Sequence, residues 1–181
     1  MIHLYCGEGK GKTTAALGLA VRALGNGFKV IFVQFMKNTP AGEILALERL
    51  GATVLRGKAG NHFFSDMTED EKRETKTISD EHFSCAIALC KKTCAAAVSA
   101  FAAHPRVLLV LDEICAAYQY EMIDRAAVDD FLRNLPVGAE IVLTGRNPPQ
   151  IFFDHADYIT EMKKIRHPFD SGIPARKGVE F

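Results

Sequence analysis

The sequence predicts an α/β fold in which a doubly wound, mostly parallel sheet carries helices on both faces. Six short apolar runs, rich in β-branched residues, alternate with stretches of helical periodicity. The runs are continuously hydrophobic, which is typical of parallel strands that are covered on both sides. A glycine-rich loop joins the first run to the first helical stretch. The expected strands cover residues 2–6, 29–35, 52–56, 106–112, 140–145 and 157–162.

The first helix is expected to begin inside the loop that follows the first strand. From Lys12 onward, apolar residues recur at helical spacing, and the pattern ends at the Gly-Asn-Gly of residues 25–27. Glycine can take the left-handed conformation that closes a helix, so the helix should stop there. A last short helix is expected to start at Pro148 and Pro149, because proline at the first helical position loses no useful donor.

A long helix is expected to open at Thr68 and to run toward Ala103. Thr68 and Glu71 form a capping-box pattern, which satisfies two of the unpaired amides at a helix start. The first half of this segment is charged and the second half is apolar. We therefore expect a solvated or partner-facing beginning and a buried end, with a break near residues 77–80.

Length and composition predict one compact domain, residues 1–181, without repeats or linkers. The 22 basic and 22 acidic side chains give a formal net charge of zero, so we expect no nucleic-acid partner and no membrane surface. The most apolar long stretch, residues 85–103, contains Lys91 and Lys92 and indicates a buried helix instead of a membrane span. The first residues lack the features of an export signal, which predicts a cytosolic protein.

The five cysteines, at positions 6, 85, 90, 94 and 115, lack the paired spacing of a zinc site. An odd number of cysteines in a cytosolic chain suits reduced thiols. Cys90 and Cys94 would share one helical face, which leaves a metal role open, although buried free cysteine commonly packs as a small hydrophobic residue.

The stretch "GEGKGKTT" predicts a phosphate-binding loop and hence a P-loop NTPase-like (RecA-like) fold. In such a loop several backbone N–H groups converge on phosphate oxygens, and the dipole of the following helix adds positive potential. Lys12 is expected to bind phosphate and the Thr13 hydroxyl to ligate magnesium. The alternative is an ordinary glycine turn with exposed lysines. The expected ATP contacts are Gly7, Glu8, Gly9, Lys10, Gly11, Lys12, Thr13 and Thr14.

The loop departs from the common pattern at its beginning. A loop of the form G-x-x-x-x-G-K-[ST] would have glycine six residues before Lys12, where this chain has Cys6. Either the loop is one residue tighter, or Cys6 fills the position of the first glycine. In both cases we expect the phosphates to lie differently than in a common ATPase.

Acidic and basic residues follow two later strands. Asp112 and Glu113 end the run "VLLVLDE", and Arg146 follows the run "EIVLTG". Ligands of open α/β sheets bind beyond the carboxyl ends of the strands. The two carboxylates are therefore expected to hold Mg²⁺, directly or through water, the alternative being an acidic cap on the next helix. Arg146 is expected to bind phosphate or substrate oxygens, the alternative being a surface ion pair.

These motifs together resemble the ATP:corrinoid adenosyltransferase family of the CobA/CobO/BtuR type. The shifted phosphate loop combined with the C-terminal tail makes the resemblance far more specific than a phosphate loop alone. The resemblance extends from end to end of the chain. It rests on "GEGKGKTTAALGLAVRALGNG", "VQFMK" at 33–37, "LVLDE" at 109–113, "VLTGRNPP" at 142–149 and "HPFDSGIPARKGVEF" at 167–181.

The resemblance implies that ATP donates its adenosyl group and not a phosphoryl group. In the family, a Co(I) corrinoid attacks the 5′ carbon of the ribose, and intact triphosphate leaves. The loop, Lys12 and Mg²⁺ would then neutralise the departing triphosphate, with Lys12, Thr13 and Glu113 as the residues that act in catalysis. Because Co(I) has no proton to lose, we expect no general base and no catalytic histidine or serine.

The resemblance also implies that Co(II) is stripped of its lower axial ligand before reduction, with aromatic residues packed below the metal. This chain has no tryptophan, and the matching region reads "KAGNHFFSDMTEDE". Phe63 and Phe64 are the expected corrinoid-binding residues, because two adjacent apolar rings in a polar loop need a reason. The alternative is that they anchor the loop to the core.

The family resemblance further implies a flavoprotein electron donor and a homodimer, in which a neighbouring subunit helps to enclose the corrinoid because no segment precedes the first strand. Two other hypotheses stay open at this point: an ordinary P-loop ATPase or small-molecule kinase, and a non-enzymatic module that binds nucleotide or corrinoid. Asp170, Arg176 and Lys177 in the tail either contact ligand or complete the fold.

Overall fold

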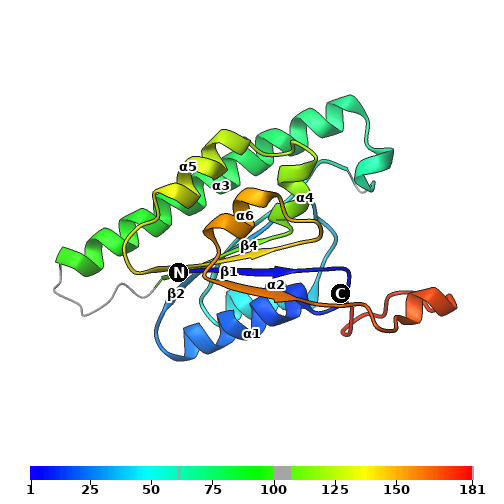
Figure 1. The fold of residues 1–181 in the computed structure, drawn as a ribbon, viewed down its shortest axis with the longest axis horizontal. Coiled ribbons are helices and arrows are strands. Elements are labelled where there is room, and N and C mark those ends of the chain that lie inside the picture. The colour runs from blue at the N-terminus through cyan, green and yellow to red at the C-terminus, as the bar shows by residue number, and fades with distance from the viewer. Residues whose placement is uncertain (61, 100–106, 181) are drawn as a thin grey trace.

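The computed structural model describes residues 1–60, 62–99 and 107–180. Six strands form one sheet in the order β3-β2-β4-β5-β1-β6, and all neighbouring strands are parallel (Figure 1). The predicted α/β class and the expected strands are confirmed within a residue or two, and Arg106 lies outside the described residues. The strands are β1 (Ile2–Cys6), β2 (Lys29–Gln34), β3 (Thr53–Arg56), β4 (Val107–Asp112), β5 (Ala139–Thr144) and β6 (Tyr158–Glu161).

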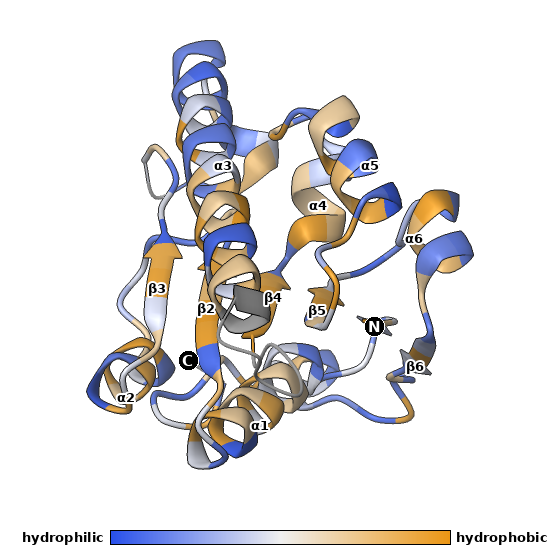
Figure 2. Ribbon diagram, turned by 90° about the vertical axis from the view of Figure 1, so that its left-hand side faces the viewer, coloured by the Kyte–Doolittle hydropathy of each residue, from blue (hydrophilic) through white to orange (hydrophobic). Residues whose placement is uncertain are grey.

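Helices cover both faces of the sheet, as the continuous hydrophobic runs predicted. Successive residues of β2 point to opposite faces: Ile31 and Val33 belong to one core cluster, and Val30 and Phe32 to the other. The hydropathy colouring in Figure 2 places apolar residues on the central strands and on the helix sides that meet them. The helices α1 (Lys12–Gly25) and α2 (Gly42–Arg49) cover one face, and α3 (Glu69–Ser99), α4 (Ile114–Gln119), α5 (Arg125–Arg133) and α6 (Gln150–His155) cover the other.

Helix α3 is continuous, so the expected break near residues 77–80 is wrong. Polar side chains in this region bond within the fold and leave the backbone helical. Ser79 donates to the Thr75 carbonyl, and the Thr75 hydroxyl accepts from the amide of Ala59. Lys76 pairs with Asp80 one turn later. The part of the predicted helix at residues 100–103 lies outside the described residues.

The expected helix ends are largely confirmed. The Thr68 hydroxyl accepts from the Glu71 amide, and the Glu71 carboxylate accepts from the Thr68 amide, which is the predicted capping box. Helix α1 begins at Lys12 inside the loop, and Gly27 beyond its end has a left-handed φ of 75°. Helix α6 starts one residue later than expected, with Pro149 as its N-cap.

The carboxyl ends of the strands meet at one edge of the sheet, and three segments gather there. Figure 1 shows the loop after β1, the 3₁₀ turn η1 (Phe64–Asp66) and the C-terminal tail with η2 (Pro168–Ser171) all at this edge. Among the described residues, no helix has both the length and the apolar character needed to cross a membrane. Cys90 and Cys94 pack in the core between α3 and the sheet.

Candidate functional site

The phosphate loop lies against the segment that follows β6. Gly7 and Gly11 have φ values of 101° and 120°, which residues with a Cβ rarely adopt. The Gly9 amide donates to the Met162 carbonyl at 2.6 Å. A Cβ atom at Gly7 or at Gly9 would stand only 2.6 Å from that same oxygen. Glycine is therefore required at positions 7 and 11 by the backbone conformation of the turn, and at positions 7 and 9 by the close approach to the backbone at Met162.

Cys6 ends the strand and does not form part of the turn. It pairs in register with Glu161 of β6, and its carbonyl accepts from the Met162 amide at 2.8 Å. The left-handed turn starts one residue later, at Gly7. Between the two alternatives left by the sequence, this geometry supports the tighter loop.

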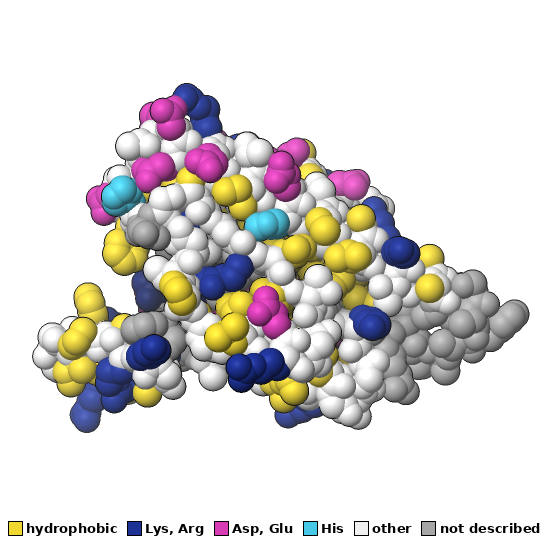
Figure 3. Space-filling model, turned by 180° about the vertical axis from the view of Figure 1, so that it is seen from behind, with side chains coloured by type: hydrophobic (Ala, Val, Ile, Leu, Met, Phe, Trp, Pro, Cys, Tyr) yellow, Lys and Arg dark blue, Asp and Glu magenta, His cyan; other side chains and the backbone are white. Residues whose placement is uncertain are grey.

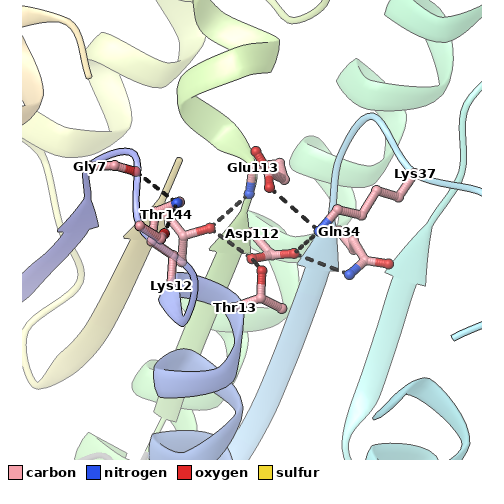
Figure 4. Close-up of polar contacts among 9 residues, drawn as sticks. Gly7, Lys12, Thr13, Gln34, Lys37, Asp112, Glu113 and Thr144 are labelled. Atoms are coloured by element: carbon pink, nitrogen blue, oxygen red, sulfur yellow. Dashed lines mark hydrogen bonds and ion pairs between the residues drawn. The ribbon is translucent and has the colours of Figure 1, made fainter. Parts of the chain in front are cut away.

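The Lys12 side chain folds back into the loop. Its ammonium group donates to the carbonyls of Gly7 and Gly9, at 2.7 and 2.8 Å, and the residue is buried (Figure 4). Burial lowers the pKa of Lys12, while the carboxylate of Glu113 works in the opposite direction. The loop thus holds a cation at its centre. Phosphate oxygens could replace the two carbonyl oxygens as acceptors of its hydrogen bonds.

Asp112, at the end of β4, is completely buried and fully hydrogen-bonded. One carboxylate oxygen accepts from the hydroxyls of Thr13, at 2.8 Å, and Thr144, at 2.7 Å. The other oxygen accepts from the Gln34 amide at 3.1 Å and from the Lys37 ammonium at 3.2 Å. Figure 4 shows these donors converging from α1, β5 and the end of β2. Asp112 therefore orients the Thr13 hydroxyl and joins three neighbouring elements.

Glu113 follows with a left-handed φ of 61°, and its amide donates to the Thr144 hydroxyl at 2.9 Å. Its side chain is partly exposed, and one of its oxygens lies 3.5 Å from the Lys37 ammonium. Burial alone would lower the pKa of Lys37, but the carboxylates of Asp112 and Glu113 outweigh it and raise this pKa. Lys37 thus stays a cation between the two acids.

This cluster fits a bound cation. The oxygens of Thr13, Asp112 and Glu113 gather in one place, and the Lys37 ammonium already occupies the position between the acids. Among the described residues there is no group of three or more His, Cys, Asp or Glu side chains that could hold a metal. A divalent ion here would thus rely on these few hard oxygens together with phosphate or water, as Mg²⁺ commonly does.

Two cavities flank the phosphate loop, and the tail contributes to both. The first measures about 310 Å³, with Thr13, Thr14 and Lys37 on one side and residues 178–180 on the other. The second measures about 420 Å³ and lies between Arg146 and residues 164–170. Figure 3 shows the tail as the projecting segment at the lower left, with basic and apolar side chains on its surface. The tail therefore limits the space next to the loop on both sides.

Arg146 and the tail residues engage mainly acidic partners. Arg146 lies 3.5 Å from Glu8 in the loop, and both side chains are exposed. Asp170 pairs with Lys164 at 3.0 Å, and Arg176 pairs with Glu180 at 3.0 Å. The predicted loop residue Lys10 is exposed as well. Arg146 and Asp170 line the same cavity as Glu8 of the loop, and Asp170 and Arg176 have intramolecular partners.

The two phenylalanines of the loop before α3 have different surroundings. Phe64 stacks on Tyr120 with the ring centroids 4.2 Å apart, and the Lys72 ammonium lies 5.3 Å from the same ring. Phe63 is 83% exposed. The preceding His62 is near Glu71, at 3.0 Å. The structure therefore anchors one of the predicted rings and leaves the other open.

Comparison with known proteins decides among the hypotheses that the sequence left open. A family model described as "ATP:corrinoid adenosyltransferase BtuR/CobO/CobP" matches residues 1–181. The chain belongs to the ATP:corrinoid adenosyltransferase family. This membership agrees with the P-loop NTPase-like arrangement of its sheet and loop.

Bacterial proteins named corrinoid adenosyltransferase are similar to this adenosyltransferase over its whole length. A corrinoid adenosyltransferase of Sinorhizobium sp is 34% identical over 183 residues, covering 100% of this chain and 80% of that protein. The Pseudomonas aeruginosa corrinoid adenosyltransferase is 35% identical over 186 residues, covering 100% and 83%. The Escherichia coli K12 protein of the same name is 31% identical over 182 residues, covering 100% and 85%.

Four residues of this candidate site in the adenosyltransferase chain were missed by sequence reasoning. Gln34 and Thr144 end strands on either side of β4, Lys37 follows β2, and Tyr120 follows α4. Lys37 was part of a quoted motif, "VQFMK", but no role was given to it. For two of the four, Gln34 and Thr144, the sequence does contain a signal that could have identified them: each is a polar residue at the carboxyl end of a buried strand.

Proposed function

We propose that this protein transfers the 5′-deoxyadenosyl group of ATP to the Co(I) centre of a reduced corrinoid and releases triphosphate. The electron pair of Co(I) forms the bond to the 5′ carbon, and the carbon–oxygen bond electrons leave with the triphosphate. The observation that carries the proposal is one cradle, formed by Lys12, Thr13 and Asp112, in a chain that matches the adenosyltransferase model from end to end.

The loop residues serve the leaving group. Lys12 exchanges the carbonyls of Gly7 and Gly9 for phosphate oxygens and so stabilises the negative charge that develops on the triphosphate. The amides of Glu8, Lys10, Gly11 and Thr14 are proposed as further phosphate donors, with the Arg146 side chain nearby. No proton is transferred in this reaction, so the proposed mechanism requires no general base.

Magnesium is proposed to be held by Thr13, Asp112 and Glu113, where it would neutralise triphosphate charge. Glu113 is the better candidate for direct contact, because Asp112 already accepts from four donors whereas Glu113 has a single ion pair at 3.5 Å. Asp112 would then act mainly by orienting the Thr13 hydroxyl.

The corrinoid is proposed to bind at the same edge of the sheet, against Phe63 and Phe64. The exposed Phe63 ring is available to a ligand, and the Phe64 ring is held in a fixed orientation by Tyr120. A flavoprotein donor, a homodimer and a cytosolic location belong to the same proposal. Free thiols at the described cysteines are in keeping with a reducing compartment.

The products of the reaction test the function directly. The protein is incubated anaerobically with ATP, Mg²⁺ and chemically reduced corrinoid, and phosphate products are separated by ion-exchange chromatography. We expect triphosphate and adenosylated corrinoid in equal amounts. ADP and orthophosphate formed at the same rate with and without corrinoid would instead support an ATPase and overturn the proposal.

Removing either phenylalanine ring should separate reduction from transfer. In Phe63→Ala and Phe64→Ala we expect the reduction of Co(II) to fall by about tenfold or more, equivalent to ~1.4 kcal/mol of lost stabilisation, while transfer from preformed Co(I) changes less. Both rates are followed by the absorbance of the corrinoid. Tyr120→Phe is the matched control, since it keeps the ring that stacks on Phe64. Equal losses in the two assays would contradict the assignment.

A further inference from the structure

We propose that Lys37 is a movable counter-ion, which neutralises Asp112 and Glu113 in the nucleotide-free protein, keeps free divalent cations out, and passes to the triphosphate when metal and nucleotide arrive together. The part that concerns the triphosphate rests on the proposed function. The part that concerns cation exclusion rests on the nucleotide-free structure alone.

Lys37 approaches the carboxylates from the side opposite to Lys12. Figure 4 shows Lys12 on one side of Asp112, Lys37 on the other, and Thr13 below the carboxylate. The Lys37 ammonium lies 3.2 Å from an oxygen of Asp112 and 3.5 Å from an oxygen of Glu113. It is thus the cation in direct contact with both acids among the described residues.

The backbone next to this contact is strained on both sides. Met36, immediately before Lys37, has a φ of 58°, and Glu113 has a φ of 61°. Residues with a Cβ adopt this left-handed conformation at a cost in free energy, and such residues cluster at functional sites. Here the two strained residues direct the Lys37 and Glu113 side chains toward each other, so the backbone conformation itself favours the ion pair.

The position of the ammonium conflicts with a second cation. A divalent ion that binds an oxygen of Glu113 and the Thr13 hydroxyl would share the carboxylates with Lys37, and like charges at such short range repel strongly. Lys37 must therefore withdraw before the metal can enter. An incoming triphosphate supplies a new partner for the displaced ammonium.

The surroundings allow that movement. The Lys37 side chain is 36% exposed, and its four-carbon stem is flexible. Lys37 also lines the cavity of about 310 Å³ that includes Thr13 and Thr14, so its ammonium can turn into the space next to the phosphate loop. Asp112 keeps three neutral donors, from Thr13, Thr144 and Gln34, after Lys37 leaves.

Binding of Mn²⁺ to the nucleotide-free protein tests the exclusion step. Free Mn²⁺ is measured by electron paramagnetic resonance during a titration, with no ATP and no corrinoid present. Lys37→Met should bind Mn²⁺ about tenfold tighter than the unchanged protein, because a like charge is removed from the site. Lys37→Gln provides a second variant with a polar side chain, and circular dichroism checks that each variant is folded.

Two controls locate the effect. Lys10→Met removes the same charge from the exposed part of the loop and should change the Mn²⁺ affinity by less than about twofold, because solvent and salt screen that charge. Lys37→Met combined with Glu113→Gln should lose the gain in affinity. Unchanged Mn²⁺ affinity in both Lys37 variants, or an equal gain in Lys10→Met, would overturn the proposal.

A separate measurement tests the transfer of Lys37 to the nucleotide. ATP binding at a saturating Mg²⁺ concentration, followed by calorimetry, should weaken about tenfold in Lys37→Met because one ammonium contact to the triphosphate is lost. Equal affinity would overturn this step. The Mn²⁺ titration contains neither substrate, so a failure of adenosyl transfer and a failure of the counter-ion proposal give different results.

Discussion

Replacing Lys12 with alanine is expected to lower kcat/KM for adenosyl transfer by about 10²–10³-fold or more, the range found when one preorganised donor to a developing anion is removed. The ammonium is buried in the loop and held by the carbonyls of Gly7 and Gly9, so its position is fixed before the nucleotide binds. The loss should persist with chemically preformed Co(I), because the defect concerns the departing triphosphate and not cobalt reduction.

The rate is measured anaerobically from the corrinoid absorbance at several ATP concentrations, which separates kcat from KM. Lys29→Ala is the matched control: it removes an exposed lysine at the start of β2, at the opposite edge of the sheet. Its activity should equal that of the unchanged protein. Normal turnover in Lys12→Ala would contradict the role of the loop in releasing triphosphate.

Replacing Asp112 with asparagine is expected to damage both activity and folding. The carboxylate is completely buried and accepts from Thr13, Thr144, Gln34 and Lys37. An asparagine amide would place its own N–H donors against one pair of these donors, and Lys37 would lose its buried counter-charge. We expect a loss of about 3 kcal/mol in the free energy of unfolding, within the range for breaking a buried pair.

Urea denaturation followed by circular dichroism measures this loss, and the adenosylation assay measures the accompanying fall in rate. Glu113→Gln is the informative comparison, because Glu113 is partly exposed and has a single ion pair at 3.5 Å. Its stability should change by less than about 1 kcal/mol while its activity falls. If Asp112→Asn unfolded at the same urea concentration as the unchanged protein, the structural role assigned to this carboxylate would be wrong.

The strands could be predicted well because each one is buried on both faces and leaves a continuous apolar run in the sequence. Val107–Asp112 is the clearest case, with all its residues buried. The helices were harder to predict where polar residues interrupt the pattern. A break in α3 was expected at residues 77–80, but the Ser79 hydroxyl donates to the Thr75 carbonyl, the Thr75 hydroxyl accepts from the Ala59 amide, and the helix continues. Propensity was overridden there by tertiary contacts.

The candidate site could be predicted only where it is local in the sequence. The loop from Gly7 to Thr13 carries its own signal, and Asp112 stands at the end of an obvious strand. Gln34 and Thr144 contact Asp112 because β2 and β5 lie on either side of β4, and no short sequence motif predicts that strand order. Lys37 is brought to the acids by the left-handed backbone at Met36, which no sequence pattern indicated.

The contact between Gly9 and Met162 makes the loop near the amino terminus depend on the carboxyl-terminal part of the chain. The residues proposed to hold phosphate rest on backbone contributed by the segment beyond β6. If the polypeptide were divided into two pieces at the surface between α5 and β5, the amino-terminal piece would carry the nucleotide motif without its support. ATP capture would then return only on reassembly, so this scaffold lends itself to a split reporter in which nucleotide binding signals that two fragments have met.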